Sequence, residues 1–123
     1  MPTVARLFAV TVDCPDPLSL ANFYREFLGG ELRSSNPDFV VLTTDGSVRL
    51  DFQRVDNHRP PEWPDSGAPR RLHLDFVVGD LEQVAQLLVG LGATRASHQP
   101  GSGRFLVMLD PAGHPLCLST ECN

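Results

Sequence analysis

The sequence "LHLDFVVGDLEQVAQLLVGLGATR", residues 72–95, repeats a pattern already present in "VTVDCPDPLSLANFYREFLGGELR", residues 10–33. In each copy a short β-rich run ends in a turn at an aspartate, which is Asp16 in the first copy and Asp80 in the second. Apolar residues then recur at spacings of three and four, which predicts a helix with one buried face. The chain is therefore an internal duplication, and this duplication determines the fold.

Both predicted helices have clear ends. Aspartate is a favoured N-cap, and the two apolar segments stop at Gly29–Gly30 and at Gly92, where glycine is typical of a helix C-terminus. We expect one helix over about 17–28 and the other over about 81–91.

The duplication continues beyond the helices. The segments 39–55 and 105–121 each contain two strand-like runs around a turn, "TDGS" in the first and "DPAGH" in the second, and both turns favour a hairpin. Short strands are also expected near 31–34 and 95–98. The sequence predicts an α+β fold of two βαβββ modules that form a cupped mixed sheet with the helices outside.

The 123 residues suit a single domain. We expect module one over 6–55, a linker or flap over 56–71 and module two over 72–121. The linker is rich in proline and carries Trp63, the single tryptophan. This side chain is expected either to cover a bound ligand or to anchor the linker to the body of the protein.

Composition excludes several classes of function. The hydrophobic content of 41% is sufficient for a core, and the net charge of −5 disfavours nucleic acid as a partner. Apolar runs of the length of a membrane span are absent, and the N-terminus lacks the pattern of a signal peptide. An odd number of cysteines, three, indicates a reducing, cytoplasmic setting rather than a disulfide framework.

Aligning the two copies identifies equivalent strand positions. Ala9 matches His73 on the first strands, and Asp51 matches Cys117 on the last strands. Alternation along a strand places further polar residues on the same face as these four. Because a polar concave face is typical of a small-molecule cleft, the predicted ligand-binding residues are Asp13, Gln53, Asp75 and Ser119, together with Trp63 from the linker.

Two strings, "FYREFLG" (23–29) and "LDPAGHPLCLS" (109–119), resemble the vicinal oxygen chelate superfamily. This group contains glyoxalase I, fosfomycin and bleomycin resistance proteins and extradiol dioxygenases, and the resemblance extends over residues 6 to 120. More narrowly, the chain is similar to bacterial glyoxalase-like domains. The resemblance implies a homodimer that binds a small organic molecule in a central cleft.

The resemblance also implies a metal site. Metal-dependent members carry ligands at four strand positions, which fall here on Ala9, Asp51, His73 and Cys117. Alanine cannot ligate, so the candidate metal ligands are His73, Asp51 and Cys117, a mixed nitrogen, oxygen and sulfur set that suits zinc. The alternative is that no metal or other cofactor is bound, His73 is hydrogen-bonded to Asp51 or Asp75, and Cys117 fills space.

Two functions remain open at this point. In the first, the protein is an enzyme of lyase, isomerase or dioxygenase type, with Asp51 and His73 as catalytic residues that share a proton or hold the metal. In the second, it is a non-catalytic binding protein similar to the bleomycin-resistance proteins, and its acidic residues Asp13, Asp51 and Asp75 favour a cationic ligand on which Trp63 could stack.

Overall fold

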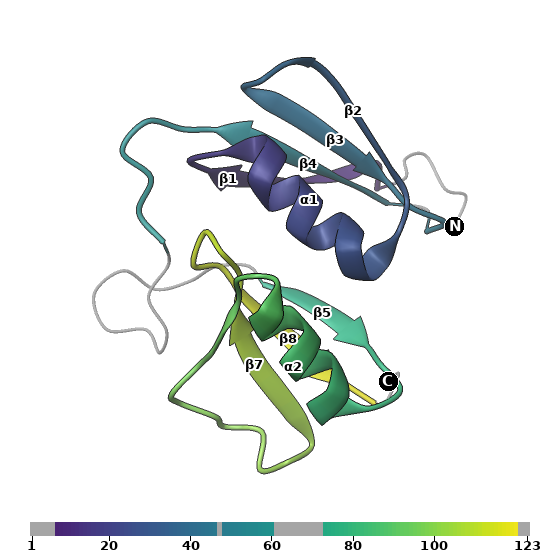
Figure 1. Cartoon of the computed structure of the whole chain (residues 1–123), viewed down its shortest axis with the longest axis vertical. Coiled ribbons are helices and arrows are strands. Elements are labelled where there is room, and N and C mark those ends of the chain that lie inside the picture. The colour runs from purple at the N-terminus through teal and green to yellow at the C-terminus, as the bar shows by residue number, and fades with distance from the viewer. Residues whose placement is uncertain (1–6, 47, 61–72, 121–123) are drawn as a thin grey trace, which may run out of the picture. The chain divides into compact units, whose positions relative to one another are not determined.

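The computed structural model describes residues 7–46, 48–60 and 73–120 of the chain. The chain divides into two compact units after His58, and each unit contains one helix and four strands in βαβββ order (Figure 1). The first unit comprises β1 (Ala9–Cys14), α1 (Pro17–Leu28), β2 (Glu31–Asn36), β3 (Phe39–Thr43) and β4 (Arg49–Arg54). The second comprises β5 (Leu74–Val77), α2 (Leu81–Gly90), β6 (Thr94–Arg95), β7 (Phe105–Leu109) and β8 (Pro115–Ser119).

The two units have the same sheet topology, which confirms the predicted pair of βαβββ modules. Strand order is β1-β4-β3-β2 in module one and β5-β8-β7-β6 in module two. The first and last strands of each module pair in parallel, and the remaining pairs are antiparallel. Each sheet is therefore mixed, with its first strand at one edge.

The strand register also repeats from one module to the other. Thr11 lies opposite Asp51 in the β1–β4 ladder, and Asp75 lies opposite Cys117 in the β5–β8 ladder. These are the pairs that the sequence alignment of the two copies makes equivalent. Positions that match in sequence thus occupy matching places in the two sheets.

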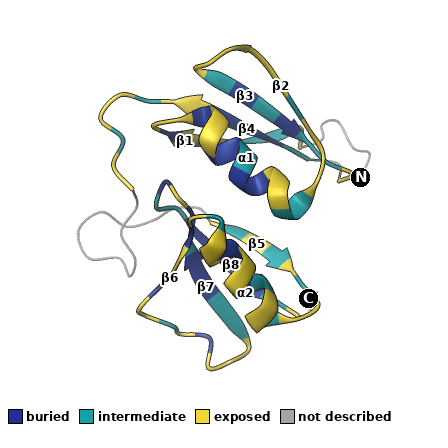
Figure 2. Ribbon diagram, viewed as in Figure 1, coloured by how far each residue is buried: buried dark blue, intermediate teal, exposed yellow. Residues whose placement is uncertain are grey.

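In module one, the apolar stripe of α1 packs on the central strands. Buried stretches lie on α1 and β3 (Figure 2). The Tyr24 ring stacks on Phe52 of β4 with a centroid separation of 5.6 Å, and both side chains are almost fully buried. Asp16 caps the helix as expected, since its Oδ1 accepts a hydrogen bond from the Ser19 amide at 3.2 Å. Phe52 thus faces the helix, which directs Asp51 and Gln53 to the opposite face of β4.

In module two, α2 is capped in the same way. Asp80 Oδ1 accepts from the Gln83 amide at 3.0 Å, and the helix ends at Gly90, one residue before the predicted end. Glu82 near the helix start forms a forked ion pair with Arg95 of β6 at 2.7 and 3.1 Å. The hydrogen bond from Arg95 holds the pKa of Glu82 below its ordinary value. Helix and edge strand are thereby connected at the surface.

The strand expected near 95–98 is shorter than predicted. Beyond Arg95, the side chain of Gln99 takes over the hydrogen bonds that a longer strand would make. Gln99 donates to the carbonyls of Ala96 and Val107, each at 2.8 Å. Gln99 also accepts from the Val107 amide at 2.9 Å. A side-chain amide has the same donor and acceptor as a peptide group, so it can satisfy β7 without a continuing strand. This exchange explains why β6 spans only Thr94–Arg95.

Residues 61–72, which include Trp63 and most of the predicted linker, lie outside the described residues. The expected roles of Trp63 and of the linker therefore remain predictions. Within the described ranges, neither helix has the length and hydropathy that crossing a bilayer requires.

Gly30, which joins α1 to β2, provides a test of the packing of module one. It has φ +99°, and a Cβ atom there would lie 2.2 Å from the Thr43 carbonyl oxygen of β3. Its neighbour Gly29 also has positive φ (+75°), but a Cβ there would meet nothing within 4 Å. We predict that Gly30→Ala lowers the free energy of unfolding by at least about 1 kcal/mol more than Gly29→Ala, because both pay for the left-handed backbone and only Gly30→Ala displaces a strand. Urea denaturation of the two variants measures the difference, and equal losses would contradict the packing described.

Candidate functional site

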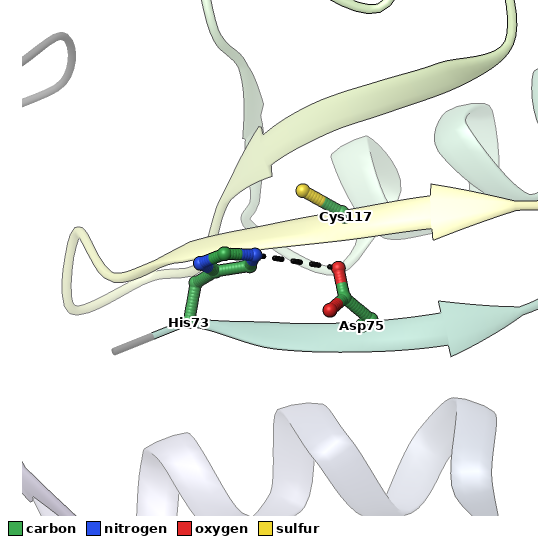
Figure 3. Close-up of side chains that lie close together, drawn as sticks. All are labelled: His73, Asp75 and Cys117. Atoms are coloured by element: carbon green, nitrogen blue, oxygen red, sulfur yellow. Dashed lines mark ion pairs between the residues drawn. The ribbon is translucent and has the colours of Figure 1, made fainter. Parts of the chain in front are cut away.

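Three potential donor side chains gather at the start of the β5–β8 pair in module two: His73, Asp75 and Cys117 (Figure 3). His73 immediately precedes β5, and Asp75 follows two residues later, so both project from the same face of the strand. Cys117 comes from β8, where it lies directly opposite Asp75. The parallel ladder thereby brings together residues more than forty positions apart in the chain.

The geometry of this cluster is compact. His73 Nε2 lies 3.4 Å from Asp75 Oδ1, and one ligand atom from each of the three residues lies within 4.8 Å of the others. The side chains of His73 and Asp75 are 34% and 72% exposed. Cys117 is largely buried and packs against Ala96 and Val107. The cluster therefore opens to solvent through the histidine and the aspartate, while the thiol closes its inner side.

The donor set fits a zinc ion, the metal that a mixed set of nitrogen, oxygen and sulfur ligands suits. Imidazole nitrogen, carboxylate oxygen and thiolate sulfur are the three ligand types that zinc accepts. With bonds of about 2.0–2.1 Å to nitrogen and oxygen, two ligands of a tetrahedral zinc are roughly 3.3–3.4 Å apart, which matches the separation of His73 Nε2 and Asp75 Oδ1. The sulfur would disfavour magnesium, which requires oxygen ligands.

Asp51, the third ligand expected from sequence, has a different partner within its own module. Asp51 is almost fully buried, and its carboxylate lies against the guanidinium of Arg49, two residues earlier on β4. Arg49 Nη2 donates to Asp51 Oδ2 at 3.1 Å, and Nε lies 2.9 Å from Oδ1. The second contact is an ion pair without a hydrogen bond, since neither Arg49 Nε nor Asp51 Oδ1 has a hydrogen-bond partner among the described residues.

Arg49 was missed by sequence reasoning and is the main addition to the site residues. Its guanidinium carbon lies 4.2 Å from the centre of the Phe8 ring, so the side chain is held by an aromatic face and by a carboxylate at once. The available signal was strand alternation, since a residue two positions from Asp51 shares its face. Alternation alone does not show which polar side chains pair.

The other predicted site residues lie on the strands that carry Asp51 and Cys117, or directly beside them. Asp13 of β1 and Gln53 of β4 are opposite one another and exposed in module one. Ser119 ends β8, opposite Val77, and is partly buried. Ala9 lies opposite Arg49 and offers no donor atom. His73, Asp75 and Cys117 form one cluster in module two, whereas Asp51, Asp13 and Gln53 belong to module one.

Comparison with protein families agrees with this architecture. The model of the glyoxalase-like domain matches residues 9–119, and the chain belongs to that family. Solved structures of the glyoxalase, bleomycin resistance and dioxygenase group, the vicinal oxygen chelate superfamily, share its fold. The resemblance read from the sequence is thereby confirmed. No curated protein matches the chain in sequence.

Three solved structures illustrate the range of this fold. A glyoxalase/bleomycin resistance protein/dioxygenase family enzyme from Burkholderia phytofirmans PsJN is 20% identical, with TM-score 0.71 and coverage of 93% of this chain and 97% of that chain. The oxidase ChaP-H2 is 20% identical, with TM-score 0.68 and coverage of 98% and 96%. A mutant fosfomycin resistance protein FosX from Listeria monocytogenes, complexed with Mn(II) and 1S,2S-dihydroxypropylphosphonic acid, is 12% identical, with TM-score 0.71 and coverage of 98% and 95%. At these identities the likeness shows the fold.

The Arg49–Asp51 pair yields a stability prediction with an internal control. Arg49→Gln should lower the free energy of unfolding by about 1–3 kcal/mol, because it leaves the buried Asp51 carboxylate without its charged partner. Arg54→Gln, on the same strand, breaks a pair with Asp56 in which both side chains are about half or more exposed, and should cost less than about 1 kcal/mol. Chemical denaturation compares the two. A loss in Arg49→Gln no larger than in Arg54→Gln would show that the Asp51 carboxylate does not depend on Arg49.

Proposed function

We propose that the protein is a glyoxalase-like enzyme that acts on a small organic molecule at the His73–Asp75–Cys117 cluster, with zinc as its metal. The observation that carries the proposal is the convergence of three different donor types within 4.8 Å at one end of a strand pair. Solved relatives with this fold include an oxidase and a fosfomycin resistance protein crystallised with Mn(II), which supports an enzymatic role and a metal for the scaffold.

Each residue of the cluster has a distinct task in this proposal. His73 and Asp75, an ion pair at 3.4 Å, would each present one ligand atom to the same ion from the start of β5. Cys117 supplies a thiolate from the buried side, where it would be shielded from solvent. Zinc bound by these side chains would act as a Lewis acid toward a carbonyl or hydroxyl oxygen of the substrate.

This proposal differs from the sequence hypothesis in one residue. The sequence analysis assigned the metal-binding and catalytic carboxylate to Asp51, and that assignment stays a prediction. The fork with Arg49 gives the Asp51 carboxylate a cationic partner, whereas Asp75 lies beside both His73 and Cys117. The local contacts therefore favour Asp75 as the carboxylate that works with His73.

The second candidate function is a binding protein without catalysis. It is favoured by the exposed carboxylates of Asp13 and Asp75 and by the net charge of −5, which together would attract a cationic ligand. Gln53, Ser119 and Trp63 remain proposed ligand contacts in either function. We further propose a homodimer, as the sequence resemblance implies. We also propose a reducing, cytoplasmic compartment, because an odd number of cysteines, three, does not suit a disulfide framework.

Metal analysis tests the proposed function directly. Purified wild-type protein should bind one zinc ion per chain, and His73→Ala, Asp75→Asn and Cys117→Ala should each abolish or greatly weaken binding, because each removes one ligand. Isothermal titration with Zn²⁺, together with elemental analysis, gives the stoichiometry and the affinity.

Asp51→Asn is the matched control in this experiment. It makes the same chemical change as Asp75→Asn, and we expect it to leave zinc binding intact. Zinc loss in Asp51→Asn but not in Asp75→Asn would restore the ligand set expected from sequence. Wild-type protein that takes up no zinc, yet melts at a higher temperature with an organic cation, would favour the binding protein instead.

A further inference from the structure

The ion pair with Asp51 engages only part of the Arg49 guanidinium and leaves several of its N–H donors available. Asp51 engages the Nε and Nη2 side of the guanidinium, and Phe8 covers one of its flat faces. Arginine has five N–H donors in a planar fork. The two hydrogens of Nη1 and the second hydrogen of Nη2 have no acceptor among the described residues, and they form the end of the fork that can receive another pair of oxygens.

The surroundings of the guanidinium leave this end accessible. The Arg49 side chain is 31% exposed, although the carboxylate that holds it is almost completely covered, at 5%. In the parallel ladder Arg49 lies opposite Ala9, whose methyl group cannot accept a hydrogen bond. Thr11, the next residue of β1 on this face, is exposed and lies opposite Asp51 in the ladder.

The internal repeat places this arrangement at the same sheet position as the metal-type cluster. With the alignment of the two copies, Ala9 and Thr11 correspond to His73 and Asp75, and Arg49 and Asp51 correspond to Pro115 and Cys117. The two ladders have matching register at these positions. Module one therefore presents a cationic fork where module two presents potential metal donors.

We propose that Arg49 is an anion-binding residue of this protein and that its ligand carries a carboxylate or phosphate-type oxyanion. An arginine fork binds two oxygens of such a group in one plane. Asp51 and Phe8 act as positioning residues: they fix the plane of the guanidinium before the ligand arrives, which reduces the ordering cost of binding. This inference goes beyond the proposed zinc chemistry, since it assigns a second site and the chemical class of its ligand, a small organic acid.

The test uses nuclear magnetic resonance of the Arg49 Nε–H signal in wild-type protein, with propionate and inorganic phosphate as probes and a chelator without carboxylate groups, 1,10-phenanthroline, present throughout. Both anions should shift this signal in a saturable way, because they bind the free end of the same guanidinium. Arg49→Lys should weaken probe binding about tenfold or more, since lysine keeps the charge and loses the planar fork. Arg54→Lys, an equivalent change on the same strand, should leave it unchanged.

Three outcomes would overturn the proposal. The first is an Arg49 signal that propionate and phosphate do not move. The second is an equal shift with chloride at matched ionic strength, which would indicate screening rather than binding. The third is a shift with tetramethylammonium but with neither anion, which would favour the cationic ligand. The wild-type titration decides among these even if Arg49→Lys does not fold. Because zinc is removed, failure of the metal site cannot be mistaken for failure of this site.

Discussion

The parallel pairing of the first and last strand within each module is the constraint on which the rest of the structure depends. A parallel pair cannot be closed by a tight turn, so one helix and two further strands separate its members in sequence. The ladder then brings distant residues side by side: Thr11 lies opposite Asp51, and Asp75 lies opposite Cys117. The helix packs on one face of each sheet through residues such as Tyr24 and Phe52. The side chains of the candidate site are thereby directed to the other face.

One backbone frame carries two kinds of chemistry in this chain. In module two the frame collects a nitrogen, an oxygen and a sulfur donor, which suits a soft or borderline metal. In module one it collects a guanidinium and a buried carboxylate on an aromatic ring, which suits recognition of an oxyanion. Duplication followed by divergence at matching positions explains this difference without any change of fold. Membership of the glyoxalase-like family fixes the scaffold, and the chemistry must be argued from these side chains.

The sequence predicted the features that depend on local pattern. Helix periodicity, the capping residues Asp16 and Asp80, and the βαβββ succession of elements along each copy follow from short-range chemistry. The duplication gave independent support for each element, because the same pattern occurs twice. Features that depend on the conformation of individual side chains could not be predicted from the sequence pattern. Arg49 could have extended into solvent, and only the structure shows that its guanidinium turns onto Asp51 and Phe8. The early end of β6 was missed because Gln99 replaces a strand with its side-chain amide. Asp75 was recognised as a polar face residue but not as the neighbour of Cys117, because the resemblance directed attention to Asp51.

The central claim is that the β5–β8 ladder builds a mixed-donor centre from His73, Asp75 and Cys117. X-ray absorption at the zinc edge of the metal-loaded wild-type protein tests it most directly, because sulfur is distinguished from nitrogen and oxygen by its longer bond to the metal. The account predicts one sulfur ligand at about 2.3 Å together with nitrogen and oxygen ligands at about 2.0–2.1 Å. A zinc shell with no sulfur would contradict it, since Cys117 would then lie outside the centre that the strand register assigns to it.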